Sequence, residues 1–173
     1  MIFITGGARS GKSDAAASIL SGREDVVYIA TGTPSDDEMV ARIETHQRQR
    51  PHGWRLIEEP ENLEGILDSV DGGPPIIIDC LTLWLANLLE TTADEEILSQ
   101  SLTASGLAAA RHSTTIVVTN EVGSGLVPMD PIGRRFRDLQ GRVNRMWAAA
   151  SDQAFLVVAG RMVTLQAPES IDV

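Results

Sequence analysis

The chain has 173 residues, of which 43% are hydrophobic and 22% are charged, and its formal net charge at pH 7 is −10. This length and composition predict one globular domain covering residues 1–173. The acidic balance argues against nucleic acid and anionic membranes as partners, because both bind basic surfaces. Cys80 is the only cysteine, and no apolar stretch of the sequence is long enough to cross a membrane, so we expect a cytoplasmic protein without an internal disulfide.

The first predicted elements are a strand at Ile2–Thr5 and a helix at Ser13–Leu20, with a glycine-rich loop between them. The loop fits the phosphate-binding pattern G-x-x-x-x-G-K-[ST] with the residues Gly6, Gly7, Ala8, Arg9, Ser10, Gly11, Lys12 and Ser13. Its glycines let successive backbone N–H groups turn toward a phosphate, and the helix points its positive end at the same anion. Lys12, the only lysine of the chain, stands where an ammonium contacts the outer phosphates, and Ser13 stands where a hydroxyl ligates Mg²⁺. The loop therefore predicts binding of a nucleoside triphosphate with Mg²⁺.

Strands and helices alternate along the rest of the chain. In chain order we expect a strand at Val26–Ile29, helices at Asp36–Arg50 and Asn62–Ser69, a strand at Ile76–Asp79, helices at Leu81–Leu89 and Asp94–Arg111, a strand at Thr115–Thr119, a helix at Pro131–Ala150, and strands at Phe155–Ala159 and Met162–Leu165. Most of the strands are continuous apolar runs, which is typical of parallel strands buried on both faces. The pattern predicts an α/β fold with a three-layer, mostly parallel sheet and helices on both faces. Ligands of such sheets bind at the carboxyl ends of the strands, where Thr31, Gly32 and Asp79 fall beside the phosphate-binding loop.

The predicted helix at Asp36–Arg50 carries a second group of candidate residues. Arg42, His46 and Arg50 are spaced four apart, so they share one face of the helix. Two guanidinium groups beside an imidazole disfavour its protonation, which leaves a neutral nitrogen available as a nucleophile or base. The same spacing also fits a solvated helix surface whose histidine has no chemical role, and spacing alone favours that interpretation.

Two further acidic residues follow apolar strands. Asp79 ends one of them, and after a phosphate-binding loop such an aspartate commonly reaches Mg²⁺ together with a residue like Ser13. The alternative is that Asp79 caps the helix that begins near Leu81. Glu121 follows the next strand and suits a base or water-positioning group, but a helix cap or a subunit contact fits it equally well.

Several blocks of the sequence resemble one enzyme family over nearly the whole chain. They comprise the phosphate-binding loop, Tyr28–Thr31, Asp36–Met39 with Arg42, Ile43 and His46, Arg50-Pro51 with Trp54 and Glu58, Asp79–Thr82 with Asn87–Leu89, Val118–Gly123 through Val127-Pro128, and Phe136–Asp138 with Gly141–Asn144. With these blocks the chain resembles the bifunctional adenosylcobinamide kinase / adenosylcobinamide-phosphate guanylyltransferase family of cobalamin biosynthesis. The loop is generic among nucleotide-binding proteins, whereas the blocks around His46 and Asn120 are specific to this family.

The resemblance implies two reactions on one RecA-like, P-loop fold. A nucleoside triphosphate, ATP or GTP, phosphorylates the hydroxyl of the aminopropanol arm of adenosylcobinamide. GTP then guanylylates a histidine with release of pyrophosphate, and the GMP passes to the new phosphate to give adenosylcobinamide-GDP. The resemblance also implies a homotrimer, in which the active site can lie between subunits.

The same resemblance implies roles for particular residues of this chain. The guanylylated histidine falls on His46, with Arg42 and Arg50 beside it to hold phosphate, and this outweighs the solvated-surface interpretation that the spacing alone favours. Glu58 is the family-guided acceptor for the N1–H and amino group of guanine. The chain departs from the family at residues 161–165 and at Arg145, where glutamine is usual, and both positions bear on subunit packing rather than on nucleotide chemistry.

Two other functions fit the sequence. One is a P-loop kinase or ATPase that uses no covalent histidine, for which replacing His46 leaves nucleotide turnover intact. The other is a regulatory module that binds GTP without chemistry, which predicts tight binding but neither a covalent label nor phosphoryl transfer.

Overall fold

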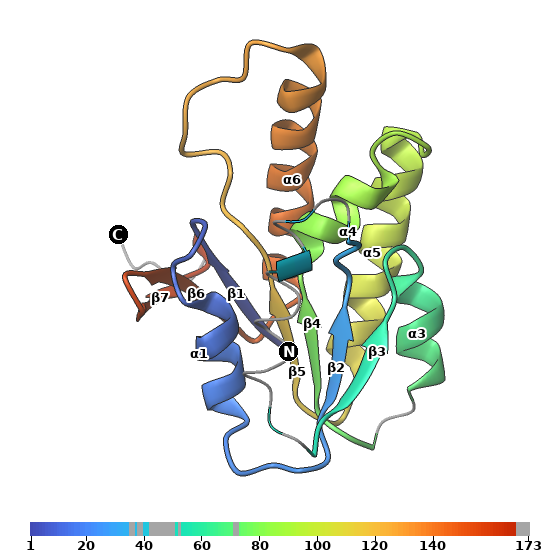
Figure 1. The fold of residues 1–173 in the computed structure, drawn as a ribbon, viewed down its shortest axis with the longest axis vertical. Helices are drawn as coiled ribbons and strands as arrows, with labels where there is room; N and C mark the ends of the chain where they lie inside the picture. Colours follow the sequence, from blue (N-terminus) through green and yellow to red (C-terminus); the bar gives the residue numbers. More distant parts are fainter. Residues whose placement is uncertain (35–36, 38–39, 42–50, 52, 71–72, 169–173) are drawn as a thin grey trace.

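A central β-sheet organises the chain in the computed structural model, which describes residues 1–34, 37, 40–41, 51, 53–70 and 73–168. Within these residues the sheet has seven strands in the order β3-β2-β4-β5-β1-β6-β7 (Figure 1). The β6–β7 pair is antiparallel, and all other neighbouring strands of this sheet run parallel. The strands are β1 (Ile2–Gly6), β2 (Val27–Ala30), β3 (Arg55–Glu58), β4 (Ile76–Asp79), β5 (Thr115–Val118), β6 (Gln153–Val158) and β7 (Arg161–Leu165).

The register of the parallel strands brings their carboxyl ends to one edge of the sheet. Ala30 on β2 pairs with Glu58 on one side and with Asp79 on the other, and Asp79 pairs in turn with Val118. Because neighbouring strands lie about 4.8 Å apart, the backbones of Glu58 and Asp79 are about 10 Å apart. The edge therefore collects polar residues that are far apart in sequence.

Helices cover both faces of the sheet and make three layers. They are α1 (Lys12–Ile19), α3 (Leu63–Ser69), α4 (Leu81–Leu88), α5 (Asp94–Ala110) and α6 (Pro131–Ala149). Of these described helices, α1 alone packs on one face, where Ala16 meets Ile4 and Ile77. The other helices pack on the opposite face around Trp84 and Trp147 (Figure 1). Burial of aliphatic strand residues on both faces explains why β1, β2, β4 and β5 are continuous apolar runs.

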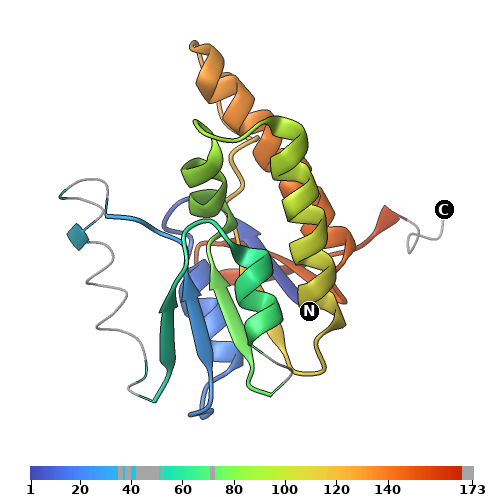
Figure 2. The same cartoon turned by 90° about the vertical axis from the view of Figure 1, so that its right-hand side faces the viewer.

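Helix α6 extends beyond the carboxyl edge of the sheet (Figure 2). It begins where Asp130 accepts a hydrogen bond from the Gly133 N–H at 2.6 Å, with Pro131 in the first turn. The loop that connects β5 to α6 carries two almost fully exposed apolar side chains, Leu126 and Met129. This end of the molecule thus offers apolar surface next to the edge where the polar residues gather.

The predicted fold class is confirmed, as are the expected strands and helices that fall within the described residues, with boundary shifts of one or two residues. One strand was missed: β3 has only four residues, begins with Arg55, ends with Glu58 and lies at the sheet edge, so its apolar pattern is short. The predicted helix at Asp36–Arg50 lies largely outside the described residues. Among the helices that the structure describes, none is long and apolar enough to cross a membrane.

Candidate active site

The phosphate-binding loop connects β1 to α1, and its shape requires glycine at two positions. Gly11 is the N-cap residue of α1 and has φ 94°, in the left-handed region that favours glycine. At Gly6 a Cβ atom would lie 2.4 Å from the Val157 carbonyl oxygen of the adjacent strand β6. The close packing of β6 therefore excludes any side chain at Gly6, which explains the first glycine of the pattern.

The side chain of Lys12 lies inside this loop and is 7% exposed. Its ammonium donates a hydrogen bond of 2.7 Å to the Gly7 carbonyl oxygen. The turn between β6 and β7 braces the loop from outside, because the Gly160 N–H donates to the Ser10 carbonyl oxygen at 2.9 Å. Gly7, Ala8 and Arg9 form the exposed rim of the loop. The predicted loop residues are thus held as one cradle at the N-terminus of α1, an arrangement suited to phosphate.

Asp79 and Ser13 come together although they are distant in sequence. The Ser13 hydroxyl donates to Asp79 Oδ2 at 2.8 Å, and the Tyr28 hydroxyl donates to the same oxygen at 2.5 Å. The alternative that Asp79 caps helix α4 is wrong, because Cys80 occupies the N-cap position and makes no side-chain cap bond. The contact of Tyr28 was not predicted, since its only signal was a hydroxyl-bearing side chain within an otherwise aliphatic strand.

A site with one hydroxyl and one carboxylate suits Mg²⁺ better than it suits a metal ion whose ligands all come from the protein. Mg²⁺ usually takes one or two protein oxygens and completes its octahedron with phosphate oxygens and water. Among the described residues there is no group of three histidine, cysteine or acidic side chains that would build a closed metal site. Ser13 and Asp79 are therefore the pair that would hold Mg²⁺ beside a bound triphosphate.

Thr31 links the end of β2 to the end of β4 by hydrogen bonds. It is fully buried, and its hydroxyl donates to the Cys80 carbonyl oxygen at 2.7 Å and accepts from the Cys80 N–H at 2.9 Å. Gly32 follows it and is half-buried, and a Cβ there would lie 3.0 Å from the Leu83 side chain. The predicted nucleotide contacts of these two residues remain predictions, and the structure places both within the carboxyl edge.

Glu58 ends β3 with an exposed side chain, two strands away from Asp79. The loop that follows it is held by Asn87 on α4, whose amide group donates to the Pro60 carbonyl oxygen at 3.0 Å and to the Thr31 carbonyl oxygen at 2.8 Å. A single side chain thus fixes the loops that leave β2 and β3. This role of Asn87 was not predicted from the sequence, because its partners come from two distant loops.

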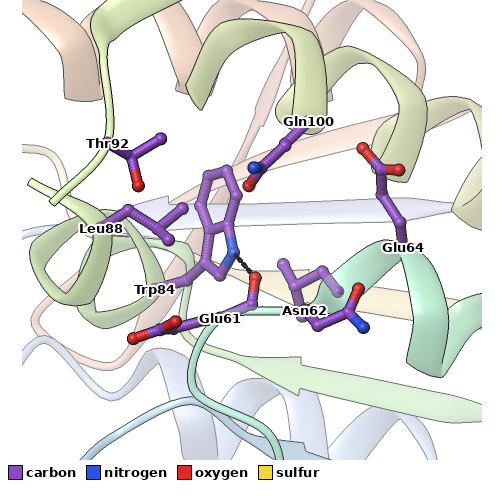
Figure 3. Close-up of a pocket in the computed structure, with 8 residues that line it drawn as sticks. Glu61, Asn62, Glu64, Trp84, Leu88, Thr92 and Gln100 are labelled. Atoms are coloured by element: carbon purple, nitrogen blue, oxygen red, sulfur yellow. Dashed lines mark hydrogen bonds between the residues drawn. The ribbon is translucent and has the colours of Figure 1, made fainter. Parts of the chain in front are cut away.

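A pocket of about 280 Å³ lies beside this loop, between α3, α4 and α5 (Figure 3). Trp84 forms its wall and donates from its indole nitrogen to the Glu61 carbonyl oxygen at 2.7 Å. None of the residues that line the pocket belongs to the predicted nucleotide site. Trp84 is also a packing residue, since its side chain is buried in the main core cluster.

Glu121 lies beside the phosphate-binding loop. Its backbone N–H donates to the Gly6 carbonyl oxygen at 3.0 Å, and its exposed carboxylate accepts from the Gly123 N–H at 2.6 Å. His46, Arg42 and Arg50 lie outside the described residues, so their predicted roles remain predictions. The described part of the site therefore consists of the phosphate-binding loop with Asp79, the loops after β2 and β3, and the start of the β5–α6 connection.

A scan against protein families matches residues 2–165 to the model for cobinamide kinase / cobinamide phosphate guanyltransferase. The chain belongs to this family. It is 39% identical over 174 residues to the bifunctional adenosylcobalamin biosynthesis protein CobU of Escherichia coli (strain K12), with 92% of this chain and 96% of that protein covered. The protein of the same name from Salmonella typhimurium is 40% identical over 181 residues, with the same coverage. The bifunctional adenosylcobalamin biosynthesis protein CobP of Pseudomonas aeruginosa is 36% identical over 166 residues, with 95% and 96% covered.

Among solved structures, the chain resembles an ATPase from the type III secretion system of pathogenic bacteria. The TM-score is 0.56 at 14% identity, and the match covers 90% of this chain and 50% of that one. A Pyrococcus horikoshii protein, the subject of structural project PH0250, matches with TM-score 0.56 at 7% identity over 95% of this chain and 84% of the other. At such low identities the likeness shows the fold alone. Family membership, in contrast, makes the chain a nucleotide-binding enzyme of the kinase and guanylyltransferase class.

Proposed function

We propose that this protein phosphorylates adenosylcobinamide and then transfers GMP from GTP to the phosphate it has made, as a late step of cobalamin biosynthesis. The observation that supports this most strongly is the similarity to bifunctional adenosylcobalamin biosynthesis proteins over 92–95% of this chain. The geometry agrees with it, because a phosphate cradle and a candidate Mg²⁺ pair share the carboxyl edge of the sheet.

The phosphate-binding loop holds the triphosphate in both reactions. Its backbone N–H groups and the start of α1 face the phosphates, and the Lys12 ammonium exchanges its bond to the Gly7 carbonyl for the outer phosphate oxygens. Mg²⁺, when bound, neutralises charge on the phosphate oxygens. In the kinase step the substrate hydroxyl oxygen forms a bond to the γ-phosphorus as the bond to the nucleoside diphosphate breaks, and the hydroxyl proton passes to water.

The guanylyl transfer runs through His46 in two displacements. The neutral imidazole nitrogen forms a bond to the α-phosphorus of GTP while the bond to pyrophosphate breaks. A phosphate oxygen of adenosylcobinamide phosphate then attacks the same phosphorus, the nitrogen–phosphorus bond breaks, and the imidazole returns to its neutral form. Arg42 and Arg50 supply positive charge for the phosphates, and they keep the imidazole neutral before attack.

Glu58 selects guanine over adenine in this proposal. A carboxylate accepts hydrogen bonds from both the N1–H and the amino group of guanine, whereas adenine presents no donor at N1. The exposed position of Glu58 at the carboxyl edge, about 10 Å from the Asp79 backbone, leaves room for a ribose between base and phosphates.

The subunits assemble as a homotrimer in this proposal, and the protein works in the cytoplasm. The exposed apolar side chains Val158, Met162, Val163 and Leu165 on β6 and β7 support an assembly, since these strands end the described sheet without a covering element. Light scattering coupled to size exclusion measures the subunit number directly. A monomer at micromolar concentration contradicts the trimer.

The central test incubates the protein with Mg²⁺ and GTP labelled at the α-phosphate. We expect wild type to retain label that is acid-labile and base-stable, as a phosphoramidate requires, and His46→Ala to retain none. His112→Ala is the matched control, because His112 is an exposed histidine in the turn after α5, away from the predicted site, and it should label like wild type. Label on His46→Ala, or none on a wild type that binds GTP, contradicts the covalent mechanism.

The two alternative functions give different results when a label at the γ-phosphate is measured beside the α-label. A P-loop kinase or ATPase without a covalent histidine releases or transfers the γ-phosphate of labelled ATP or GTP but takes no α-label. A regulatory module binds GTP and does neither. Measuring both labels therefore separates all three functions.

A further inference from the structure

The only tyrosine of the chain, Tyr28, reaches the candidate Mg²⁺ site from a neighbouring strand. Its register partner on β4 is Ile77, and Asp79 lies two residues further along β4, on the same face of the sheet. Diagonal neighbours of this kind lie within reach of an aromatic side chain. The ring therefore leans along the sheet, and its hydroxyl donates to Asp79 Oδ2.

The Tyr28 ring is fixed from the other side by Trp54. The two rings stack with centroids 6.5 Å apart and an angle of 27° between their planes. Trp54 is itself anchored, because its indole nitrogen donates to the Arg23 carbonyl oxygen at 2.8 Å. Both aromatic side chains are 7% exposed. Packing thus holds the phenol hydroxyl toward the carboxylate.

Two hydroxyls hold one oxygen of the Asp79 carboxylate, since Ser13 and Tyr28 both donate to Oδ2. Ser13 is itself a candidate metal ligand, so Mg²⁺ would set the orientation of its hydroxyl when the ion is bound. Tyr28, on a different strand, is the donor that can keep the carboxylate oriented in both states.

We propose that Tyr28 is a positioning residue for Mg²⁺: it orients the Asp79 carboxylate so that the metal joins a site already in place. The inference rests on the metal role of Asp79 in the proposed function. Groups that hydrogen-bond to metal ligands typically change metal affinity or activity by about 10- to 100-fold when they are removed. Tyr28 acts on the metal through Asp79, as a donor to the ligand and not as a ligand itself.

The first test removes the hydroxyl and keeps the ring, with Tyr28→Phe. Titrating Mg²⁺ at a fixed concentration of a fluorescent GTP analogue, whose α- and β-phosphates are joined by a methylene group so that it cannot be cleaved there, should show Mg²⁺ affinity lowered about tenfold. Affinity for the analogue in EDTA should equal that of wild type, because the phosphate-binding loop is unchanged. Thr115→Val is the matched control: it deletes a buried hydroxyl on β5 that has no hydrogen-bond partner among the described residues, and it replaces threonine with a side chain of the same shape.

A second test uses the fact that the chain has one tyrosine, so a protein labelled with ¹³C in its tyrosine rings gives a single set of ring signals. In wild type with the same uncleavable GTP analogue, these signals should shift as Mg²⁺ is added and saturate with the same constant as the fluorescence titration. In Asp79→Asn they should not respond to Mg²⁺. This test uses the native ring, so it decides the proposal even if Tyr28→Phe fails to fold.

The proposal is overturned if Tyr28→Phe binds Mg²⁺ with unchanged affinity, or if the tyrosine signals of wild type do not shift when Mg²⁺ is added. Equal losses of affinity with and without metal assign Tyr28 to general stability and overturn it as well. Both tests measure binding without turnover, so they stand apart from the guanylylation assay. If the wild-type protein takes no α-label but Tyr28→Phe still lowers Mg²⁺ affinity, the proposed guanylyl transfer is wrong and the positioning role of Tyr28 stands.

Discussion

Replacing Asn144 with alanine should destabilise the protein by about 3 kcal/mol, because its side chain holds the end of β5 against α6. The amide oxygen accepts from the Thr119 hydroxyl and from the Gln140 amide, both at 2.8 Å, and the amide nitrogen donates to the Asn120 carbonyl oxygen at 3.0 Å. Each of these three bonds is worth about 1 kcal/mol net. Thr119 and Gln140 keep a 3.0 Å bond to each other, which prevents a larger loss.

Urea unfolding followed by circular dichroism measures this free energy, and thermal unfolding should show a midpoint lowered by about 6–12 °C for a chain of this size. The control is Arg145→Ala on the same helix, one residue further and exposed, which should stay within about 0.5 kcal/mol of wild type. A loss below about 1 kcal/mol for Asn144→Ala would refute the reasoning, because it would mean that these buried groups find other partners at little cost.

Three further predictions concern the same edge and the surface. Gly6→Ala should abolish nucleotide binding and lower the free energy of unfolding by about 1–3 kcal/mol, because the new Cβ would lie 2.4 Å from the Val157 carbonyl oxygen. A fluorescent GTP analogue measures the binding and urea unfolding measures the stability. Binding equal to that of wild type contradicts the steric argument. Asn87→Ala should lower the free energy of unfolding by about 2 kcal/mol and weaken GTP binding, because two loop carbonyls lose their donor. Asn87→Asp keeps the shape of the side chain but loses the donor, so it should have the same effects. If neither variant changes stability or binding, Asn87 does not hold these loops. The bidentate hydrogen bond from the Arg23 guanidinium lowers the pKa of the Asp25 carboxyl. Any stability from this pair is therefore present above the usual carboxyl pKa and is lost as pH falls through the lowered pKa. Carboxyl ¹³C NMR should show a higher titration midpoint for Asp25 in Arg23→Gln, and an unchanged midpoint contradicts the pairing.

The local parts of the site could be predicted from the sequence. The phosphate-binding loop is one continuous segment whose glycines, lysine and serine have fixed spacing, so pattern and structure coincide. The main strands were predictable for a similar reason: residues buried on both faces give uninterrupted apolar runs. Strand β3 was not predicted, because a strand at the edge of a sheet is less buried than a central one and can carry polar residues such as Arg55 and Glu58.

The contacts between distant segments could not be predicted in this way. Tyr28 meets Asp79 because β2 and β4 pair in one particular register, and a shift of one residue would turn the aspartate to the other face. The two bonds between the Thr31 hydroxyl and the Cys80 backbone depend on the same register. Sequence spacing contains no information about that pairing, so Thr31 was predicted as a nucleotide contact and its role as a cross-link was missed.

Helix α4 connects these non-local contacts into one arrangement. Its apolar residues Leu81, Trp84, Leu85 and Leu88 recur at helical spacing and bury one face in the core. Its polar residues serve different loops: the Thr82 hydroxyl accepts from the Asn120 N–H at 2.8 Å, and Asn87, about 7.5 Å further along the axis, binds the loops after β2 and β3. Because a closely packed helix moves as a unit, the separation of these two residues sets the distance between the loop that follows β5 and the loop that follows β3. The spacing of Thr82 and Asn87 on one rigid helix thereby holds the loop after β5 in place relative to the loops after β2 and β3.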